Sequence, residues 1–127
     1  MTVQPLNFLF DRLIITQFEK MDNSEVEKAK ALIIAEMIEY VPNSVVIKTI
    51  IKKSTGNISA VSVDSGEALA ENSIPFDAFV QIIDGKAEII IDGVSNFLDT
   101  GESIIIPANT LNLVRGKERF KMISNIV

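Results

Sequence analysis

Apolar residues occur along most of this chain in short runs, separated by clusters of glycine, aspartate, asparagine, serine and threonine. From Val45 onward the runs are rich in valine and isoleucine, and several alternate apolar with polar positions, as half-buried strands do. The pattern predicts strands over residues 45–53, 57–63, 76–83, 86–91, 96–98, 102–106, 110–114 and 119–127. So many short strands at regular spacing predict a sandwich or a closed barrel, which removes exposed edges by packing two sheets together.

Three turn sequences indicate how neighbouring strands are joined. Ser54-Thr55-Gly56 separates the first two predicted strands and predicts an antiparallel pair. Asp-Gly favours the type I′ turn of a hairpin, because both central residues of that turn need positive φ. We therefore predict hairpin turns at Asp84-Gly85 and at Asp92-Gly93.

The chain before the first predicted strand has a different pattern. The apolar positions of residues 1–23 fit a helix and a strand equally well. Ser24 and Glu27 have the spacing of a helix capping box, and apolar residues recur at helical intervals after them. This pattern predicts a helix from about Ser24 to Glu39, ended by Pro42 and the turn residues around it.

The composition indicates one compact domain, because a chain of 127 residues with 47% hydrophobic content can cover a single core. The net charge is −5, and residues 64–114 contain nine acidic residues and one lysine. The only basic cluster is Arg115, Lys117, Arg119 and Lys121, which is short and interrupted by Glu118. Nucleic acid is therefore not an expected partner, since it requires extended basic surfaces.

The absence of cysteine excludes a disulfide framework and thiolate catalysis, and makes the cytoplasm the expected location. The apolar run from Leu6 to Phe18 is split by Asp11 and Arg12, and it lacks the flanking features of a signal peptide. It is also too short for a membrane span, which takes about 20 apolar residues. We therefore expect no membrane partner.

The stretch from Gly66 to Gly85, GEALAENSIPFDAFVQIIDG, resembles the first motif of the cupin barrels. In that family two histidines and one glutamate lie at fixed positions between the two glycines and bind a metal ion. Here both glycines are in place, but the histidine positions are Asn72 and Ile74, and the glutamate position is Ala78.

A second stretch, GESIIIPANTLNLVRG from Gly101 to Gly116, resembles the second cupin motif. Gly101 and Pro107 match the family. Asn109 occupies the place of the motif's second glycine, a mild change because asparagine tolerates left-handed backbone. Asn112 occupies the place of the histidine that supplies the fourth metal ligand, and Gly116 the place of the terminal asparagine.

The resemblance implies an all-β fold, the double-stranded β-helix or jelly-roll barrel of the cupins, with a short helical N-terminal region. It assigns residues 45–127 to the barrel and residues 1–44 to an extension that packs on the barrel or on a dimer partner. It also favours a short strand over Ala31 to Ile34 followed by a short helical turn, as an alternative to the longer helix.

The metal ligands of the family are missing from this chain. All four ligand positions have lost their donors, and the sequence contains no histidine. Asp77 is next to Ala78, but successive strand residues point to opposite faces, so Asp77 should face away from the lumen. Two neutral amides are poor ligands even for hard cations. We therefore expect no metal and no other cofactor.

The alignment to the two motifs also predicts what lines the barrel lumen. The amides of Asn72 and Asn112 should converge on the position that the metal occupies in the family. The rest of the predicted lining is apolar: Ile74, Ala78, Val80, Ile82 and Val114. Such a lining is typical of a small-molecule pocket, but it fits a filled core equally well, with the two amides satisfying each other and one or two trapped waters.

These observations predict a metal-free barrel that binds a small organic ligand and is not an enzyme. Catalysis near neutral pH requires histidine, or a carboxylate or lysine with a shifted pKa, and only Glu71 and Asp77 beside the first motif are candidates. The alternatives are a metal-independent isomerase or lyase that uses one of these two residues, and a protein that is chiefly a dimerisation module. Tyr40, the only tyrosine, is expected to pack against the barrel.

The resemblance also implies a homodimer, because cupins commonly pair through their sheets. The segment from Leu6 to Phe18 would otherwise be a large exposed apolar patch, which soluble monomers rarely carry. We expect this segment to help cover the dimer interface.

Overall fold

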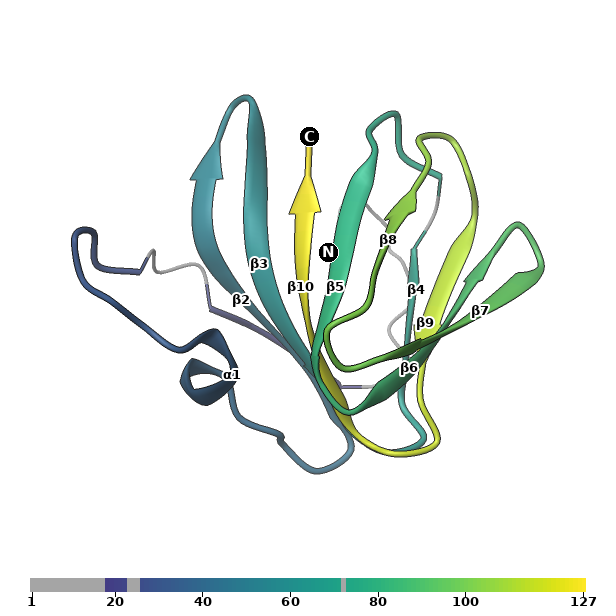
Figure 1. Ribbon diagram of the computed structural model, residues 1–127, viewed down its shortest axis with the longest axis horizontal. Coiled ribbons are helices and arrows are strands. Elements are labelled where there is room, and N and C mark those ends of the chain that lie inside the picture. The colour runs from purple at the N-terminus through teal and green to yellow at the C-terminus, as the bar shows by residue number, and fades with distance from the viewer. Residues whose placement is uncertain (1–17, 23–25, 72) are drawn as a thin grey trace.

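The computed structural model describes residues 18–22, 26–71 and 73–127, and for residues 18–22 and 71 it describes the backbone. The regular secondary structure of the described residues consists of strands and one short helix (Figure 1). The strands are β1 (Phe18–Asp22), β2 (Ser44–Lys53), β3 (Gly56–Val63), β4 (Ala68–Glu71), β5 (Ala78–Asp84), β6 (Lys86–Ile91), β7 (Val94–Asp99), β8 (Ser103–Ile106), β9 (Asn112–Arg115) and β10 (Phe120–Ile126). The helix is α1 (Ile34–Met37).

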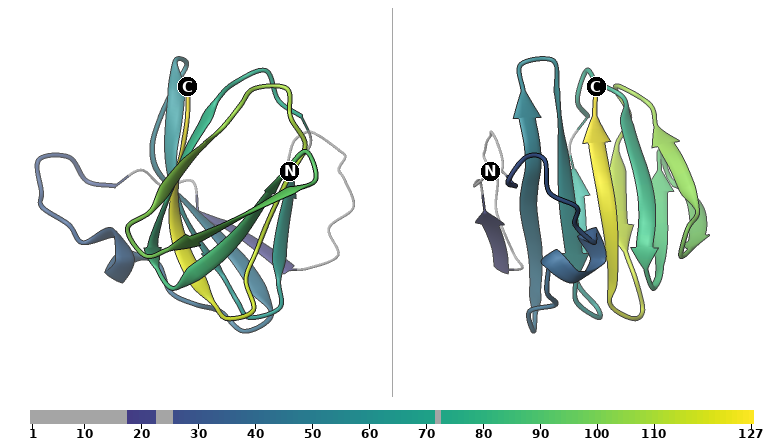
Figure 2. Two further views of the ribbon diagram at one scale, coloured as in Figure 1. Left: turned by 45° about the vertical axis from the view of Figure 1, so that its right-hand side comes forward. Right: turned by 60° about the vertical axis from the view of Figure 1, so that its left-hand side comes forward.

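The strands form two sheets that face each other (Figure 2). The larger sheet has the order β1-β2-β3-β10-β5-β8 and the smaller sheet the order β4-β9-β6-β7. Every pair is antiparallel except β1 and β2, which are parallel. The all-β double-stranded β-helix that the resemblance implied is confirmed.

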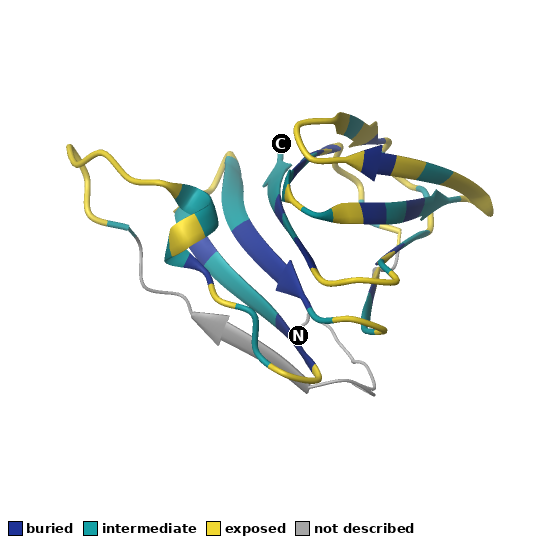
Figure 3. Ribbon diagram, turned by 60° about the horizontal axis from the view of Figure 1, so that its bottom comes forward, coloured by how far each residue is buried: buried dark blue, intermediate teal, exposed yellow. Residues whose placement is uncertain are grey.

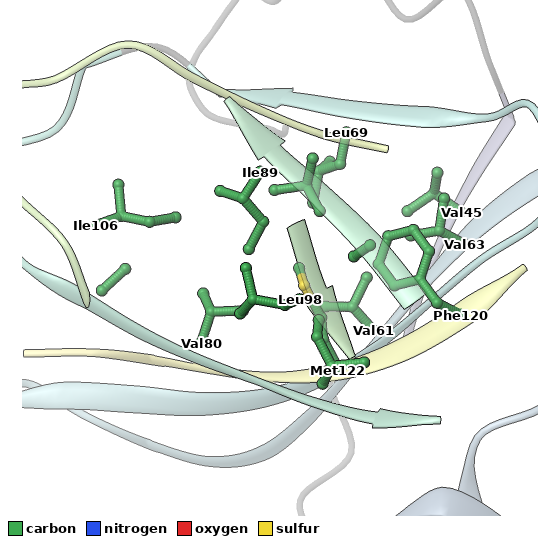
Figure 4. Close-up of a cluster of buried hydrophobic side chains, with 14 residues drawn as sticks. Val45, Val61, Val63, Leu69, Val80, Ile89, Leu98, Ile106, Phe120 and Met122 are labelled. Atoms are coloured by element: carbon green, nitrogen blue, oxygen red, sulfur yellow. The ribbon is translucent and has the colours of Figure 1, made fainter. Parts of the chain in front are cut away.

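The core lies between the two sheets because side chains alternate between the faces of each strand. In β5, for example, Ala78, Val80 and Ile82 are buried, whereas Phe79 is exposed. Figure 4 shows the cluster that these inward positions form. Its members are Val45, Val61, Val63, Leu69, Ala78, Val80, Ile82, Ala87, Ile89, Leu98, Ile106, Val114, Phe120 and Met122.

Two of the predicted turns are confirmed. The residues Ser54 and Thr55 join β2 to β3 as an antiparallel pair. Asp92 and Gly93 join β6 to β7, with φ values of 47° and 83°, as a type I′ hairpin requires.

The predicted hairpin at Asp84-Gly85 is wrong. β5 belongs to the larger sheet, where it pairs with β10 and β8, while β6 belongs to the smaller sheet. The turn is therefore a corner at which the chain passes from one sheet to the other. The propensity of Asp-Gly for positive φ is local and does not determine which sheet the next strand joins.

The predicted helix from Ser24 to Glu39 is also wrong, because α1 has only four residues. The alternative strand over Ala31 to Ile34 is not formed either, although the short helical turn after it is. We define residues 26–43 as the N-terminal arm. Its residues 27–33 are exposed and project away from the barrel, whereas α1 and the residues after it lie against the outer face of the larger sheet (Figure 3). No helix in the described residues is long and apolar enough to cross a membrane.

Tertiary contacts of the N-terminal arm explain why helical propensity does not prevail. Ile38 is buried, and the carbonyl of Glu39 accepts a hydrogen bond from Ser62 Oγ at 2.8 Å. Lys121 Nζ on β10 donates to the carbonyl of Ala35. These contacts need an arm that follows the sheet, which a longer helix would not do.

β4 is a strand that the sequence pattern does not predict, since its four residues lie inside the loop of the first motif. The expectation that Leu6 to Phe18 covers an interface falls almost entirely outside the described residues and stays a prediction.

Candidate functional site in the barrel lumen

A cavity lies between the two sheets at one end of the barrel. Its walls come from the ends of β5, β8, β9 and β10 and from the two loops that flank them. The lining residues are Ile74, Phe76, Ala78, Val80, Ile106, Pro107, Thr110, Asn112, Val114, Met122, Ser124 and Ile126.

Strand alternation brings the strand residues of this lining together. On β10 the side chains of Met122, Ser124 and Ile126 share the inward face. The ladder pairs Ser124 with Val80, so both side chains are on the same face of the larger sheet. The alternation of side chains that places residues in the core therefore also places residues around the cavity.

The cavity is narrow. The space open to the centres of water-sized molecules is about 20 Å³, which corresponds to about one water. The cavity and the solvent-filled space at its mouth together have a volume of about 410 Å³. The lumen is thus neither completely filled nor a preformed pocket for a large ligand.

The structure brings five of the predicted site residues to this cavity: Ile74, Ala78, Val80, Asn112 and Val114. Ile82 points to the same side but is fully buried in the core and does not line the cavity. Asn72 lies outside the described residues. Sequence reasoning missed the contributions of β8 and β10. On β10 the alternation of Phe120 and Met122 with Lys121 is a signal that could have located the inward face, whereas β8 has three consecutive isoleucines and gives no such signal.

Three polar side chains line the cavity, and their hydrogen bonding differs. The Thr110 hydroxyl donates to the carbonyl of Pro107 at 2.7 Å. The Asn112 amide and the Ser124 hydroxyl have no hydrogen-bonding partner among the described residues. Polar groups in such positions usually find a partner, so within this part of the chain these two are available to water or to a ligand.

A clasp between two loops forms one side of the cavity mouth. Asp77 Oδ1 accepts a hydrogen bond from Ala108 N at 2.8 Å, and the carbonyl of Ile74 accepts one from Asn109 N at 2.7 Å. Asn109 has a φ of 63°, the left-handed conformation expected at a glycine position of the motif. Asp77 is exposed and faces away from the lumen, so its observed role is to connect the loops.

Glu71 lies at the edge of the cavity by its position in a ladder. The β4–β9 ladder pairs Glu71 with Asn112, the residue that lines the cavity. Of the two acid or base candidates, Glu71 is therefore the one whose register position is next to the lumen.

In the part of the chain whose side chains are described, the ionisable groups with shifted pKa values lie outside the lumen. Hydrogen bonds from Arg115 (2.9 Å) and Ser95 (2.6 Å) lower the pKa of Glu88 on the outer face of the smaller sheet. Burial and a 2.6 Å hydrogen bond to Asp84 raise the pKa of Tyr40 well above its ordinary range. Tyr40 thus packs against the barrel, as the sequence predicted, and is not a catalytic acid of the cavity.

The residues at the family's ligand positions do not fit a metal ion. Ile74 and Ala78 supply only hydrocarbon, and Asn112 supplies one neutral amide. Tightly bound cations need several oxygen, nitrogen or sulfur ligands. In the described part of the chain no three or more aspartate and glutamate residues are grouped to replace them.

Two facing sheets joined by corner turns, with a cavity at one end, define a double-stranded β-helix barrel. Solved structures with the same fold include a conserved protein of unknown function from Streptococcus pyogenes, with 27% identity and a TM-score of 0.76 over 84% of this chain and 93% of that one. A cupin superfamily protein from Desulfitobacterium hafniense has 26% identity and a TM-score of 0.75 over 83% of this chain and 96% of that one.

A cupin 2 conserved barrel domain protein from Leptotrichia buccalis has 33% identity and a TM-score of 0.71; the alignment covers 73% of this chain and 45% of that one. The chain belongs to the cupin superfamily, and the resemblance inferred from its two motifs is confirmed. No protein-family model matches the sequence, and no curated protein matches it either.

Proposed function

We propose that this protein is a non-enzymatic cupin barrel that binds a small organic ligand in its lumen. The observation that carries the proposal is a cavity at the barrel mouth that contains an amide, Asn112, without a hydrogen-bonding partner in the described residues. Mostly apolar walls with a few polar groups are the usual composition of a small-molecule site. No metal is needed, since shape and hydrogen bonds hold such a ligand.

The size of the cavity limits the ligand. The space now available holds about one water, so an organic molecule has to displace that water and extend into the mouth beside Phe76 and Thr110. The side chain of Phe76 is 52% exposed, so its ring can turn outward with little loss of packing. The ligand is therefore small, or only one end of it enters the lumen.

A thermal-shift screen of the whole chain against a metabolite library tests the proposal. A ligand that binds the folded state raises the melting temperature by mass action. Asn112→Leu should abolish that rise, because it removes the amide from the cavity. Asn125→Leu makes the same substitution on the outer face of β10, opposite exposed Phe79, and should leave the rise unchanged. Stabilisation that survives both Asn112→Leu and Asn72→Leu would contradict binding in the lumen.

The ladder that pairs Glu71 with Asn112 supports a second candidate function, a metal-independent isomerase or lyase. In that case Glu71 is the general acid or base, and Asp77 only connects the loops. Any activity found should be lost in Glu71→Gln and kept in Asp77→Asn. A pH–rate profile that keeps the same ionisation in Glu71→Gln would contradict this role.

A further inference from the structure

The walls of the cavity contain no ionisable side chain among the described residues that line it. Nine of the lining residues are apolar, and only Thr110, Asn112 and Ser124 are polar. A charged group that entered would lose its hydration without gaining a partner of opposite charge, which carries a large penalty. The lining therefore selects against ions.

The two polar groups without partners in the described residues approach the cavity from opposite walls. Asn112 is on β9 of the smaller sheet, and Ser124 is on β10 of the larger sheet. An amide and a hydroxyl each donate and accept hydrogen bonds. Together they fit a head group such as a carbonyl, carboxamide or alcohol, which can accept, donate or do both.

Carboxylates near the mouth already have protein partners. Asp77 Oδ1 accepts from Ala108 N at 2.8 Å, and Asp92 Oδ1 accepts from Leu111 N at 3.0 Å. Neither residue lines the cavity. Glu71 is the ionisable residue whose register position adjoins the cavity, so a test of ligand charge has to include it.

We propose that the ligand of the lumen is uncharged, with a compact apolar body and a single hydrogen-bonding head group that the Asn112 amide and the Ser124 hydroxyl hold between them. This inference rests on the proposed function and adds the chemical class of the ligand. The head group replaces the water for which the cavity has room, and the apolar body extends into the mouth beside Phe76 and Thr110.

Three probes with the same isobutyl-type body test the inference: isobutyramide, isobutyrate and isobutylammonium. Each is titrated into the whole chain with labelled methyl groups, and NMR shifts of the Val80, Val114 and Met122 methyls report binding in the lumen. We expect the Kd of isobutyramide to be at least about tenfold lower than that of either ion. Asn112→Leu should weaken isobutyramide binding at least about fivefold, and Asn125→Leu should not change it.

The outcomes separate the ligand class from the proposed function. If isobutyrate or isobutylammonium shifts the lumen methyls as strongly as isobutyramide, the ligand class is wrong while binding in the lumen stands. Preference for isobutylammonium that disappears in Glu71→Gln would assign the selectivity to Glu71 instead. If no probe shifts these methyls at its solubility limit, both the ligand class and the lumen as a binding site are wrong.

Discussion

Phe120 is fully buried at the end of the barrel away from the cavity mouth, and two glycines let the backbone approach it. A Cβ atom on Gly116 would lie 2.8 Å from Phe120 Cδ1, and one on Gly85 would lie 2.7 Å from the carbonyl oxygen of Arg119. Gly85 also has a φ of 86°. The closing glycine of the first motif is thus required by a corner and by a close contact, and not by a hairpin.

We expect Gly85→Ala to lower the free energy of unfolding by about 2–5 kcal/mol, because it adds a steric clash to left-handed strain. Gly66→Ala is the matched control, since Gly66 has a φ of 78° but a Cβ atom added there would meet nothing within 4 Å. It should cost only about 1–2 kcal/mol. Urea unfolding measures both, and equal losses would show that the contact at Gly85 is unimportant.

The residues of the site differ in how far the sequence could reveal them. Ile74, Ala78 and Asn112 could be placed at the lumen because the two motifs fix their position and strand alternation fixes their direction. Phe76 was missed although it begins the predicted strand over residues 76–83 and shares the alternation of Ala78 and Val80; in the structure it lies just before β5 and lines the cavity. Ser124 was missed because it lies on β10, outside both motifs.

Among the elements, the strands from β2 onward were predictable except for β4, and the N-terminal arm was not. The short β-branched runs bounded by turn residues that mark a strand are a local signal, and β6, for instance, has the predicted bounds of Lys86 and Ile91. The conformation of the arm depends on distant partners such as Ser62 and Lys121, which no local pattern contains. The same dependence on distant partners explains why Asp84-Gly85 became a corner.

The hydrogen bond that connects the two loops at the cavity mouth can be tested by changing the side chain of Asp77. Asp77→Ala removes the acceptor of the Ala108 amide and should lower the free energy of unfolding by about 1–2 kcal/mol. Hydrogen exchange at Ala108 should accelerate accordingly. Asp77→Asn keeps an oxygen acceptor at the same place and should remain close to the parent protein. If Asp77→Asn exchanges as fast as Asp77→Ala, the negative charge rather than the hydrogen bond holds the loops.

At the scale of the whole molecule, one row of residues on the outer face of the larger sheet is mostly apolar. The ladders align Ile58, Asn125, Phe79 and Ile105 in one row across four strands. Ile105 is 61% exposed, and the row contains no charged residue. A face of this kind can pair with the same face of a second copy without repulsion, in spite of the net charge of −5.

We therefore expect a homodimer that uses this face. Ile105→Glu should shift the dimer towards monomer at micromolar concentration, because it would bury a carboxylate of each copy in the interface without a partner of opposite charge. Val94→Glu on β7 of the smaller sheet changes an equally exposed residue and should have no effect. Light scattering during size-exclusion chromatography measures both. A monomeric parent, or an equal response to the two substitutions, would contradict the expectation.

The position of β10 in the larger sheet affects how the protein is made in the cell. β10 lies between β3 and β5 and follows both of them in sequence. β3 therefore lacks its partner on that side until β10 has been synthesised; Val63, for example, pairs with Phe120. A ribosome adds roughly 5–20 residues per second, so several seconds pass between the synthesis of β3 and that of its partner. During that time β3 has an unpaired edge, which is prone to join a neighbouring nascent chain. Completion of the barrel is thus a late event, and the yield of folded protein should depend on chaperones that protect this edge during translation.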